Sequence, residues 1–193
     1  MGNFFEALYD VLFQPNIAMR NAAEGRKMGQ ALAVVLLSSL LPIWAVYFGL
    51  KTAGMQQAVS IIVVMHIIGS LAMWIVGSAV WHLIAELLGG KGTAAGLFTA
   101  LGFAHLPRIF IVPLWVLAAL MPAGIRPLIM TVTGFAIAFW VLYLDVAALR
   151  GSHELSGTRA VLVMLAPAVA VAAAVIILFA TAGTAFMRMP GLM

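Results

Sequence analysis

The amino-acid sequence predicts an all-α membrane protein, a bundle of five transmembrane helices. Three observations predict this fold class: 65% of the 193 residues are hydrophobic, only 8% are charged, and the charges separate long apolar stretches. An average soluble domain has about 45–50% apolar and about 25% charged residues. A chain with so few charges would expose large apolar patches to water, so hydrocarbon is the solvent that fits it.

Five apolar stretches follow one another along the chain, covering residues 28–50, 58–83, 93–121, 128–149 and 160–183. The first lies between Lys27 and Lys51 and is long enough to cross a hydrocarbon core of about 30 Å. The third is broken or kinked at Pro107, because proline interrupts the hydrogen bonding of a helix. This third stretch is either one bent helix or a short interfacial piece followed by a span.

The remaining parts of the chain are short and more polar. Residues 1–27 are expected to form a cytoplasmic segment, residues 28–187 the membrane domain and residues 188–193 a tail. In the first segment hydrophobic residues recur at helical spacing, namely Phe4, Leu8, Val11 and Leu12. An amphipathic helix of this kind either lies on the cytoplasmic leaflet or packs on the protein's own loops.

Lysine and arginine are unevenly distributed between the two sides of this layout. The side of the N-terminus carries six of them, Arg20, Arg26, Lys27, Lys91, Arg150 and Arg159, and the opposite side carries Lys51, Arg126 and Arg188. Cytoplasmic loops of membrane proteins are enriched in these residues. The asymmetry therefore predicts a cytoplasmic N-terminus, and an odd number of spans then places the C-terminus outside.

Several classes of function find no support in the sequence. The net charge is +4, but the basic residues are scattered singly between apolar stretches, so we expect no nucleic-acid partner. Without cysteine the chain has no disulfide, thiolate zinc site or cysteine nucleophile. No nucleophile–base pair, phosphate-binding loop or dinucleotide motif is present. We therefore expect no enzymatic activity and no cofactor.

Arg108 is the charged residue with the highest expected cost, because it falls inside the third apolar stretch. A charge at the centre of a membrane helix costs about 2.5–3.5 kcal/mol on insertion scales. The leading hypothesis is an ion pair with Asp145 or Glu86 that fixes helix packing. The alternatives are a contact with a substrate or a lipid phosphate, and extension of the side chain to the membrane surface.

Three histidines form a second group of polar candidates. His82 and Glu86 are four residues apart and share one helix face, and His105 could complete a group of three ligands. We interpret them as a hydrogen-bonded interfacial cluster and predict no metal site, because two residues at this spacing often coincide by chance. His66 lies inside the second stretch, where we favour a structural hydrogen bond to Ser38 or Ser39 over proton relay.

Three short motifs occur in a fixed order: Asp10 to Pro15, then Leu101, Gly102 and Phe103 with Pro107, and finally Leu155 and Ser156 with Arg159 and Ala160. They resemble, in this order, three motifs of the Yip1 family. These are an aspartate-to-proline motif before the membrane domain, a leucine-glycine-aromatic signature that ends in proline, and the final loop.

This resemblance implies five spans and a non-catalytic role, in membrane organisation or a trafficking-like process, through helix–helix, protein-partner or lipid contacts. Eukaryotic members have a long cytosolic N-terminal segment and act with Rab GTPases, whereas this chain is similar to the short prokaryotic type. We therefore expect a bacterial cytoplasmic membrane, with lipid, other membrane proteins or a second copy as partners. The alternative function is a small transporter or channel subunit with a polar path around Arg108.

Overall fold

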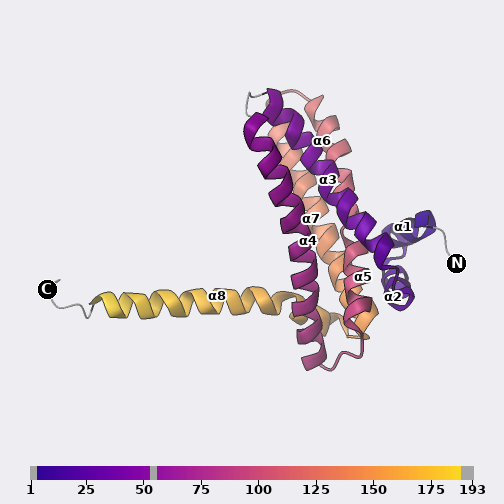
Figure 1. Ribbon diagram of the computed structural model, residues 1–193, viewed down its shortest axis with the longest axis vertical. Helices are drawn as coiled ribbons and strands as arrows, with labels where there is room; N and C mark the ends of the chain where they lie inside the picture. Colours follow the sequence, from indigo (N-terminus) through magenta and orange to yellow (C-terminus); the bar gives the residue numbers. More distant parts are fainter. Residues whose placement is uncertain (1–3, 53–55, 188–193) are drawn as a thin grey trace.

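The computed structural model describes residues 4–52 and 56–187, and in these ranges the regular secondary structure is entirely helical. The elements in chain order are α1 (Phe4–Phe13), α2 (Pro15–Gly25), α3 (Met28–Thr52), α4 (Gln56–Leu87), α5 (Ala94–Ala104), the 3-10 helix η1 (Leu106–Phe110), α6 (Ile111–Ala119), α7 (Arg126–His153) and α8 (Gly157–Met187). Figure 1 shows α3, α4, α6 and α7 running side by side along the long axis.

Four segments of the described chain are long and apolar enough to cross a membrane: Val59–Leu87, Ala94–Ala119, Arg126–His153 and Gly157–Ala182. The described part of α3 also contains a shorter apolar helix, Met28–Trp44. The prediction of an all-α protein with membrane-spanning helices is therefore confirmed.

The third apolar stretch consists of three consecutive helical pieces. The α-helix α5 ends at Ala104, the 3-10 helix η1 follows, and α6 begins at Ile111. Pro107 lies in the first turn of η1, where its missing N–H leaves no α-helical hydrogen bond to be broken.

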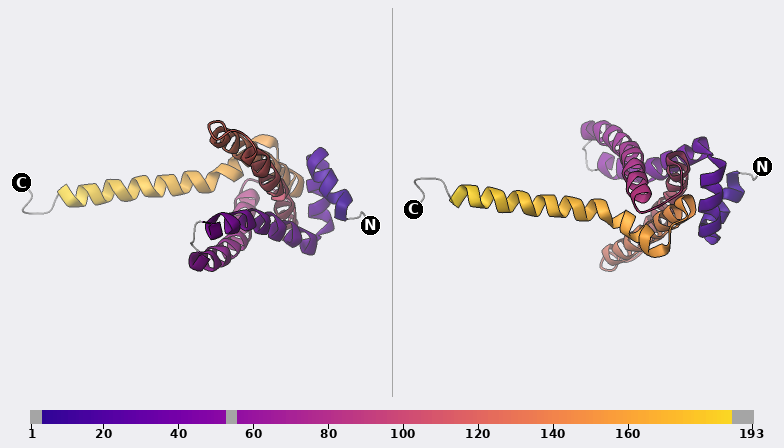
Figure 2. Two further views of the ribbon diagram at one scale, coloured as in Figure 1. Left: turned by 90° about the horizontal axis from the view of Figure 1, so that it is seen from above. Right: turned by 90° about the horizontal axis from the view of Figure 1, so that it is seen from below.

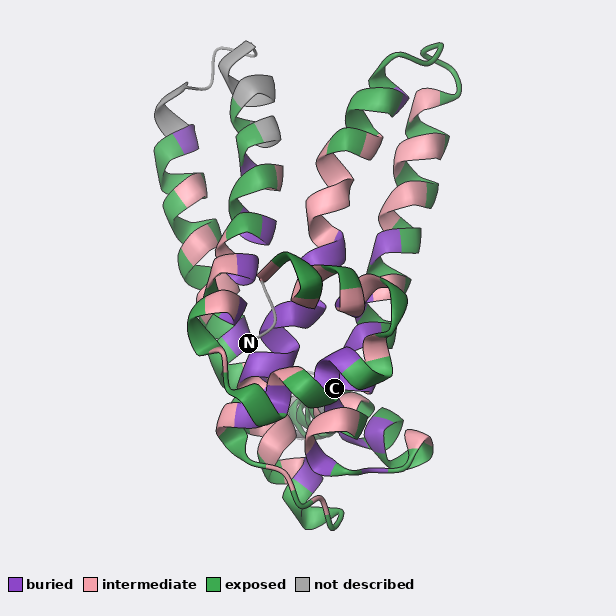
Figure 3. Ribbon diagram, turned by 90° about the vertical axis from the view of Figure 1, so that its right-hand side faces the viewer, coloured by how far each residue is buried: buried purple, intermediate pink, exposed green. Residues whose placement is uncertain are grey.

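The buried core lies near one end of the bundle. There α2 packs against α5 and α7, and the ends of α4 and α8 complete the cluster. The largest fully buried side chains include Met19, Leu97, Phe103, Leu144 and Leu149. Figure 3 shows buried residues concentrated in the lower part, while the α3–α4 and α6–α7 pairs separate toward the upper end. The upper parts of these helices therefore offer apolar surface to lipid.

Helix α1 uses its predicted hydrophobic face to pack on the protein itself. Val11 is buried, and Phe4, Leu8 and Leu12 pack against the core. A second aromatic row stays exposed on the same helix, formed by Phe5, Tyr9 and Phe13. The sequence pattern identified the face formed by Phe4, Leu8, Val11 and Leu12 correctly. Of the two interpretations, lying on the cytoplasmic leaflet or packing on the protein, the structure shows packing on the protein.

The loop between the last two helices is shorter than the polar stretch 150–159 suggested. Helix α7 continues to His153 and α8 begins at Gly157. Glu154 adopts a left-handed conformation with φ of 56°, which ends α7 in the manner usual for a helix C-terminus. Polar residues at both ends of the predicted loop are thus helical, because α7 and α8 extend beyond their apolar parts.

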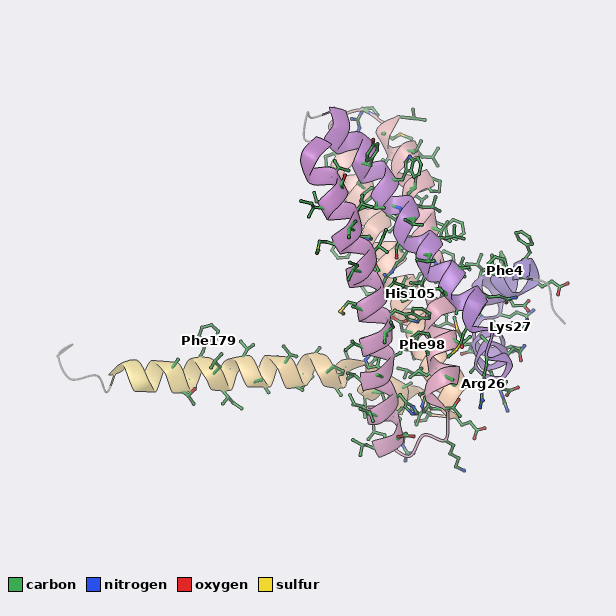
Figure 4. All side chains as sticks on the ribbon, in the orientation of Figure 1. Phe4, Arg26, Lys27, Phe98, His105 and Phe179 are labelled. Atoms are coloured by element: carbon green, nitrogen blue, oxygen red, sulfur yellow. The ribbon has the colours of Figure 1, made fainter. Side chains whose placement is uncertain are left out.

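Helix α8 projects away from the side of the bundle, across the direction of α4 (Figures 1 and 2). Its first turns pack against α4 and α7, where Ala160 and Val163 are fully buried. Residues 168–182 are exposed, and only 6% of the most apolar window of α8 is buried. Figure 4 shows the Phe179 side chain projecting from α8 away from every other helix.

Candidate functional site

A cavity of about 420 Å³ lies between α4, the α5–η1 junction and α7. Its polar lining consists of His66, Ser70, Ser78, His105, Arg108 and Asp145. The sequence stretches that supply them are far apart, so helix packing alone brings these groups together.

Small residues on α4 leave the cavity open along that helix. A methyl group added at Gly69 or Gly77 would meet no other atom within 4 Å. Both glycines line the cavity, and they lie eight residues, or about two turns, apart along the helix. They therefore leave open space between the larger side chains that α4 places in the cavity wall, Met73, Trp74 and Trp81.

Trp74 fixes the position of α4 relative to α5 midway along the α4 wall of the cavity. Its indole Nε1–H donates to the carbonyl oxygen of Phe98 at 3.0 Å, and the two rings stack with centroids 3.8 Å apart. Gly102 lies directly beside this tryptophan and Ala31 of α3, with no room for a side chain. Three helices therefore meet at one level of the bundle.

Arg108 and Asp145 share the cavity without touching. Asp145 is 7% exposed and Arg108 is half-buried, and their charges interact through space. Within the described ranges, neither side chain has a hydrogen bond, and the ion pairs formed there are between other residues. The sequence predicted an ion pair between Arg108 and Asp145. The two residues thus line the same cavity, and the side chain of each can still form hydrogen bonds.

The predicted histidine group is divided between two places. His105 donates from Nδ1 to the carbonyl oxygen of Leu101 at 2.9 Å and lines the cavity, inside the bundle as labelled in Figure 4. His66 lines the outer part of the same cavity and is exposed. Ser38 donates to the carbonyl of Val35 instead of contacting His66.

His82 and Glu86 remain together near the end of α4, but their partner is His153 of α7. His82 Nδ1 lies 2.9 Å from His153 Nε2, and His82 Nε2 lies 3.4 Å from Glu86 Oε1. The hydroxyl of Ser152 is 2.9 Å from His153 Nδ1. With both rings neutral and protonated at Nε2, every contact pairs one donor with one acceptor, from Ser152 to Glu86.

His153 is the residue of this cluster that the sequence did not reveal. It lies 71 residues from His82, and only the packing of α4 against the end of α7 brings the rings together. Gly90 and Gly92 cross directly over the His153 ring, where a Cβ would be too close to it. Within residues 4–52 and 56–187, no group of three or more histidine, aspartate and glutamate side chains is arranged to hold a metal ion.

Replacing His153 tests the structural role of this cluster. We expect His153→Ala to lower the free energy of unfolding by about 1–3 kcal/mol, because the half-buried His82 Nδ1 would lose its donor. Unfolding of the purified protein in mixed micelles, titrated with a denaturing detergent, measures the change. His66→Ala is the matched control, since that ring is exposed. Equal stability of the two variants would contradict a structural role for the contact between His82 and His153.

Basic residues gather at the end of the bundle that holds the buried core. Arg20, Arg26, Lys91 and Arg150 line two adjoining surface depressions there. Arg20 pairs with Glu24 at 2.9 Å, and this carboxylate raises the pKa of the guanidinium. Four of the six cations assigned to the side of the N-terminus therefore lie together in the structure.

Comparison with known proteins gives one match. The family model described as the Yip1 domain matches residues 9–179, which include all three of the motifs identified in the sequence. Neither the curated proteins nor the solved structures contain a match to this chain.

Proposed function

Because the chain belongs to the Yip1 domain family, we propose that it is a non-catalytic, multi-pass membrane protein that acts by holding lipids and other membrane helices. The observation that carries this proposal is α8. This helix provides a 26-residue apolar segment, Gly157–Ala182, of which very little is covered by the rest of the described chain. Lipid or a partner helix must cover such a surface, and its many alanines suit close helix packing.

The bundle is proposed to cross the membrane five times, with α3 as the first span. Lys27 precedes α3 and Lys51 lies near its end, while Arg126 and Arg150 lie near the two ends of α7, and the residues of each pair are 24 positions apart. At 1.5 Å per residue this interval is about 36 Å, which places both cations of each pair just outside a hydrocarbon core of about 30 Å. The two helices therefore match the same bilayer thickness.

Helix α8 is proposed to turn about its base in the bilayer and run beside α4 and α7. It is apolar on all sides, so a position flat on the membrane surface would leave apolar side chains in contact with headgroups and water. The basic cluster near α2 then faces the cytoplasm, and the C-terminus lies outside, in a bacterial cytoplasmic membrane.

Single cysteines test this topology cleanly, because the chain has none of its own. In intact cells we expect a membrane-impermeant maleimide to label Ala123→Cys and Leu192→Cys but not Lys91→Cys. Permeabilised cells should give labelling at all three positions. Protection of Leu192→Cys in intact cells would contradict the fifth crossing.

Photo-crosslinking along α8 tests the proposed role. A photoreactive amino acid at Ile176 or Phe179, both exposed, should form adducts with lipid or with a membrane protein in native membranes. The same group at the buried Ile137 should give only internal adducts. The absence of any external adduct on α8 would contradict a role based on contacts.

The cavity favours one second candidate, a small transporter subunit with a polar path around Arg108. This function predicts solute flux into proteoliposomes that Arg108→Ala abolishes while the protein remains folded. The non-catalytic role predicts no such flux. A flux measurement on the reconstituted protein therefore distinguishes the two candidate functions.

A further inference from the structure

The depth of the polar cavity in the bilayer follows from the contacts between helices. A methyl group added at Gly102 would contact Ala31 and Trp74, so these three residues lie at one level of the bundle. Ala31 is four residues, or about 6 Å, from Lys27 along α3, and Asp145 is five residues, or about 8 Å, from Arg150 along α7. The part of the cavity around Trp74 and Asp145 thus lies about 6–8 Å from the flanking cations, toward the membrane interior.

With the flanking cations about 3 Å outside the hydrocarbon core, this level lies about 3–5 Å inside the edge of the core, next to the glycerol groups and far from the bilayer midplane. The headgroup regions occupy about 5–8 Å on each side of the hydrocarbon core. Arg108 follows α5, which packs among α2 and the basic end of the bundle, so it lies closer to that end than its central place in the third apolar stretch suggested. A charge at this depth can reach a headgroup.

The charges in the cavity select a ligand that carries both signs. Arg108 presents a planar fork of N–H donors, which matches the oxygens of a phosphate group. Asp145 is a carboxyl group with unused acceptor capacity in the same cavity, and it matches an ammonium group with N–H donors. A simple anion would satisfy Arg108 but would be repelled by Asp145.

The walls of the cavity suit the rest of a lipid molecule. Trp74 and Trp81 provide amphipathic surfaces next to the charged groups, as tryptophan does at membrane interfaces. From the level of Trp74 the open space beside Gly69 extends along α4 toward the outer leaflet. An acyl chain can occupy this space while the headgroup stays at the charged end.

We infer that this cavity binds an ethanolamine phospholipid, with the phosphate held by Arg108 and the ammonium group held by Asp145. The inference rests on the proposed function, because it names the lipid that a contact-based membrane protein would hold. Choline phospholipids carry the same net charge but have no N–H group for Asp145. Phospholipids with a glycerol headgroup (phosphatidylglycerol) have the phosphate group but no ammonium group.

Competitive lipid retention tests the inference. The full-length protein would be reconstituted in nanodiscs of ethanolamine, glycerol and choline phospholipids in equal parts, then extracted in mild detergent and analysed by native mass spectrometry. We expect retention of the ethanolamine lipid to exceed that of the choline lipid by about tenfold or more, the ratio that corresponds to one charge-assisted hydrogen bond.

Two near-isosteric variants separate the roles of the two charges. Asp145→Asn should abolish the preference for ethanolamine over glycerol lipid, and Arg108→Gln should reduce retention of both. Arg20→Gln, which removes an exposed cation outside the cavity, is the matched control and should retain the wild-type preference. Thermal unfolding in detergent checks that each variant is folded.

Two results would overturn the inference. One is equal retention of the three lipids by the folded wild-type protein. The other is restored stability in the charge-exchange variant Arg108→Asp/Asp145→Arg together with a lipid preference that neither single variant alters, because this would identify a structural ion pair. In either case, crosslinks from α8 to lipid or to another protein would still support the proposed function. The absence of such crosslinks would contradict both the proposed function and the lipid inference.

Discussion

Gly102→Val is expected to destabilise the bundle by about 3 kcal/mol or more, the upper part of the range for overpacked cores. A Cβ at this position would lie 2.7 Å from the Cβ of Ala31 and 3.0 Å from the indole of Trp74. Both neighbours are buried and belong to other helices. Because three helices meet here, a larger residue must push α3 or α4 away from α5.

The matched control for Gly102→Val is Gly134→Val on α7. A methyl group added at Gly134 would meet nothing within 4 Å, so a larger side chain there displaces no close neighbour. The midpoint of unfolding in detergent should fall strongly for Gly102→Val and change little for Gly134→Val. Similar midpoints for the two variants would contradict the close contact of α3, α4 and α5.

Trp74→Ala is expected to have an effect of the same order, about 3–5 kcal/mol, as is usual when a large buried aromatic side chain is removed. The indole is 5% exposed, stacks on Phe98 and supplies a hydrogen bond to its carbonyl oxygen. Trp74→Phe should lose about 1 kcal/mol, because it keeps the aromatic ring but removes the donor.

Phe139→Ala is the control for aromatic truncation, since Phe139 is 68% exposed on α7 and lipid can fill the space it leaves. Detergent-titrated unfolding should rank the variants in the order wild type, Phe139→Ala, Trp74→Phe and Trp74→Ala, from most to least stable. If Trp74→Ala were as stable as Phe139→Ala, Trp74 would not be holding α4 against α5.

The positions of the long helices could be predicted from the apolar stretches of the sequence alone. Apolar stretches of membrane length dominate the sequence, and lipid as a solvent leaves the backbone no alternative to internal hydrogen bonding. The helix ends were less accessible, because local backbone geometry decides them. Glu154 in its left-handed conformation ends α7, and no hydropathy pattern marks that residue.

The contents of the polar sites depended on contacts between distant segments. His82 and Glu86 were found from their spacing on one helix, but their partner His153 comes from another helix. Arg108 and Asp145 were linked by charge, and the structure places both in one cavity without an ion pair. Spacing along a helix is a local property, whereas a cavity is defined by how several helices pack.

The depth of Arg108 shows most clearly where the sequence was insufficient. Its position near the middle of an apolar stretch suggested the centre of the bilayer. The structure shows that the first part of this stretch, α5, packs among α2 and the basic end of the bundle. Part of the apolar stretch therefore builds a protein core instead of crossing lipid.

Nitroxide labels along α4 test the central claim most directly, namely that the cavity opens at the level of the cytoplasmic headgroups. Cysteines at Ile68, Met73 and Leu83, all exposed on α4, can each be labelled alone. In bilayers, the relative accessibility of each label to oxygen and to a polar nickel complex gives its depth. The account predicts the greatest depth at Ile68, a shallow position at Met73 beside the cavity, and Leu83 outside the hydrocarbon core. A greatest depth at Met73, or a Leu83 label as deep as Ile68, would contradict it.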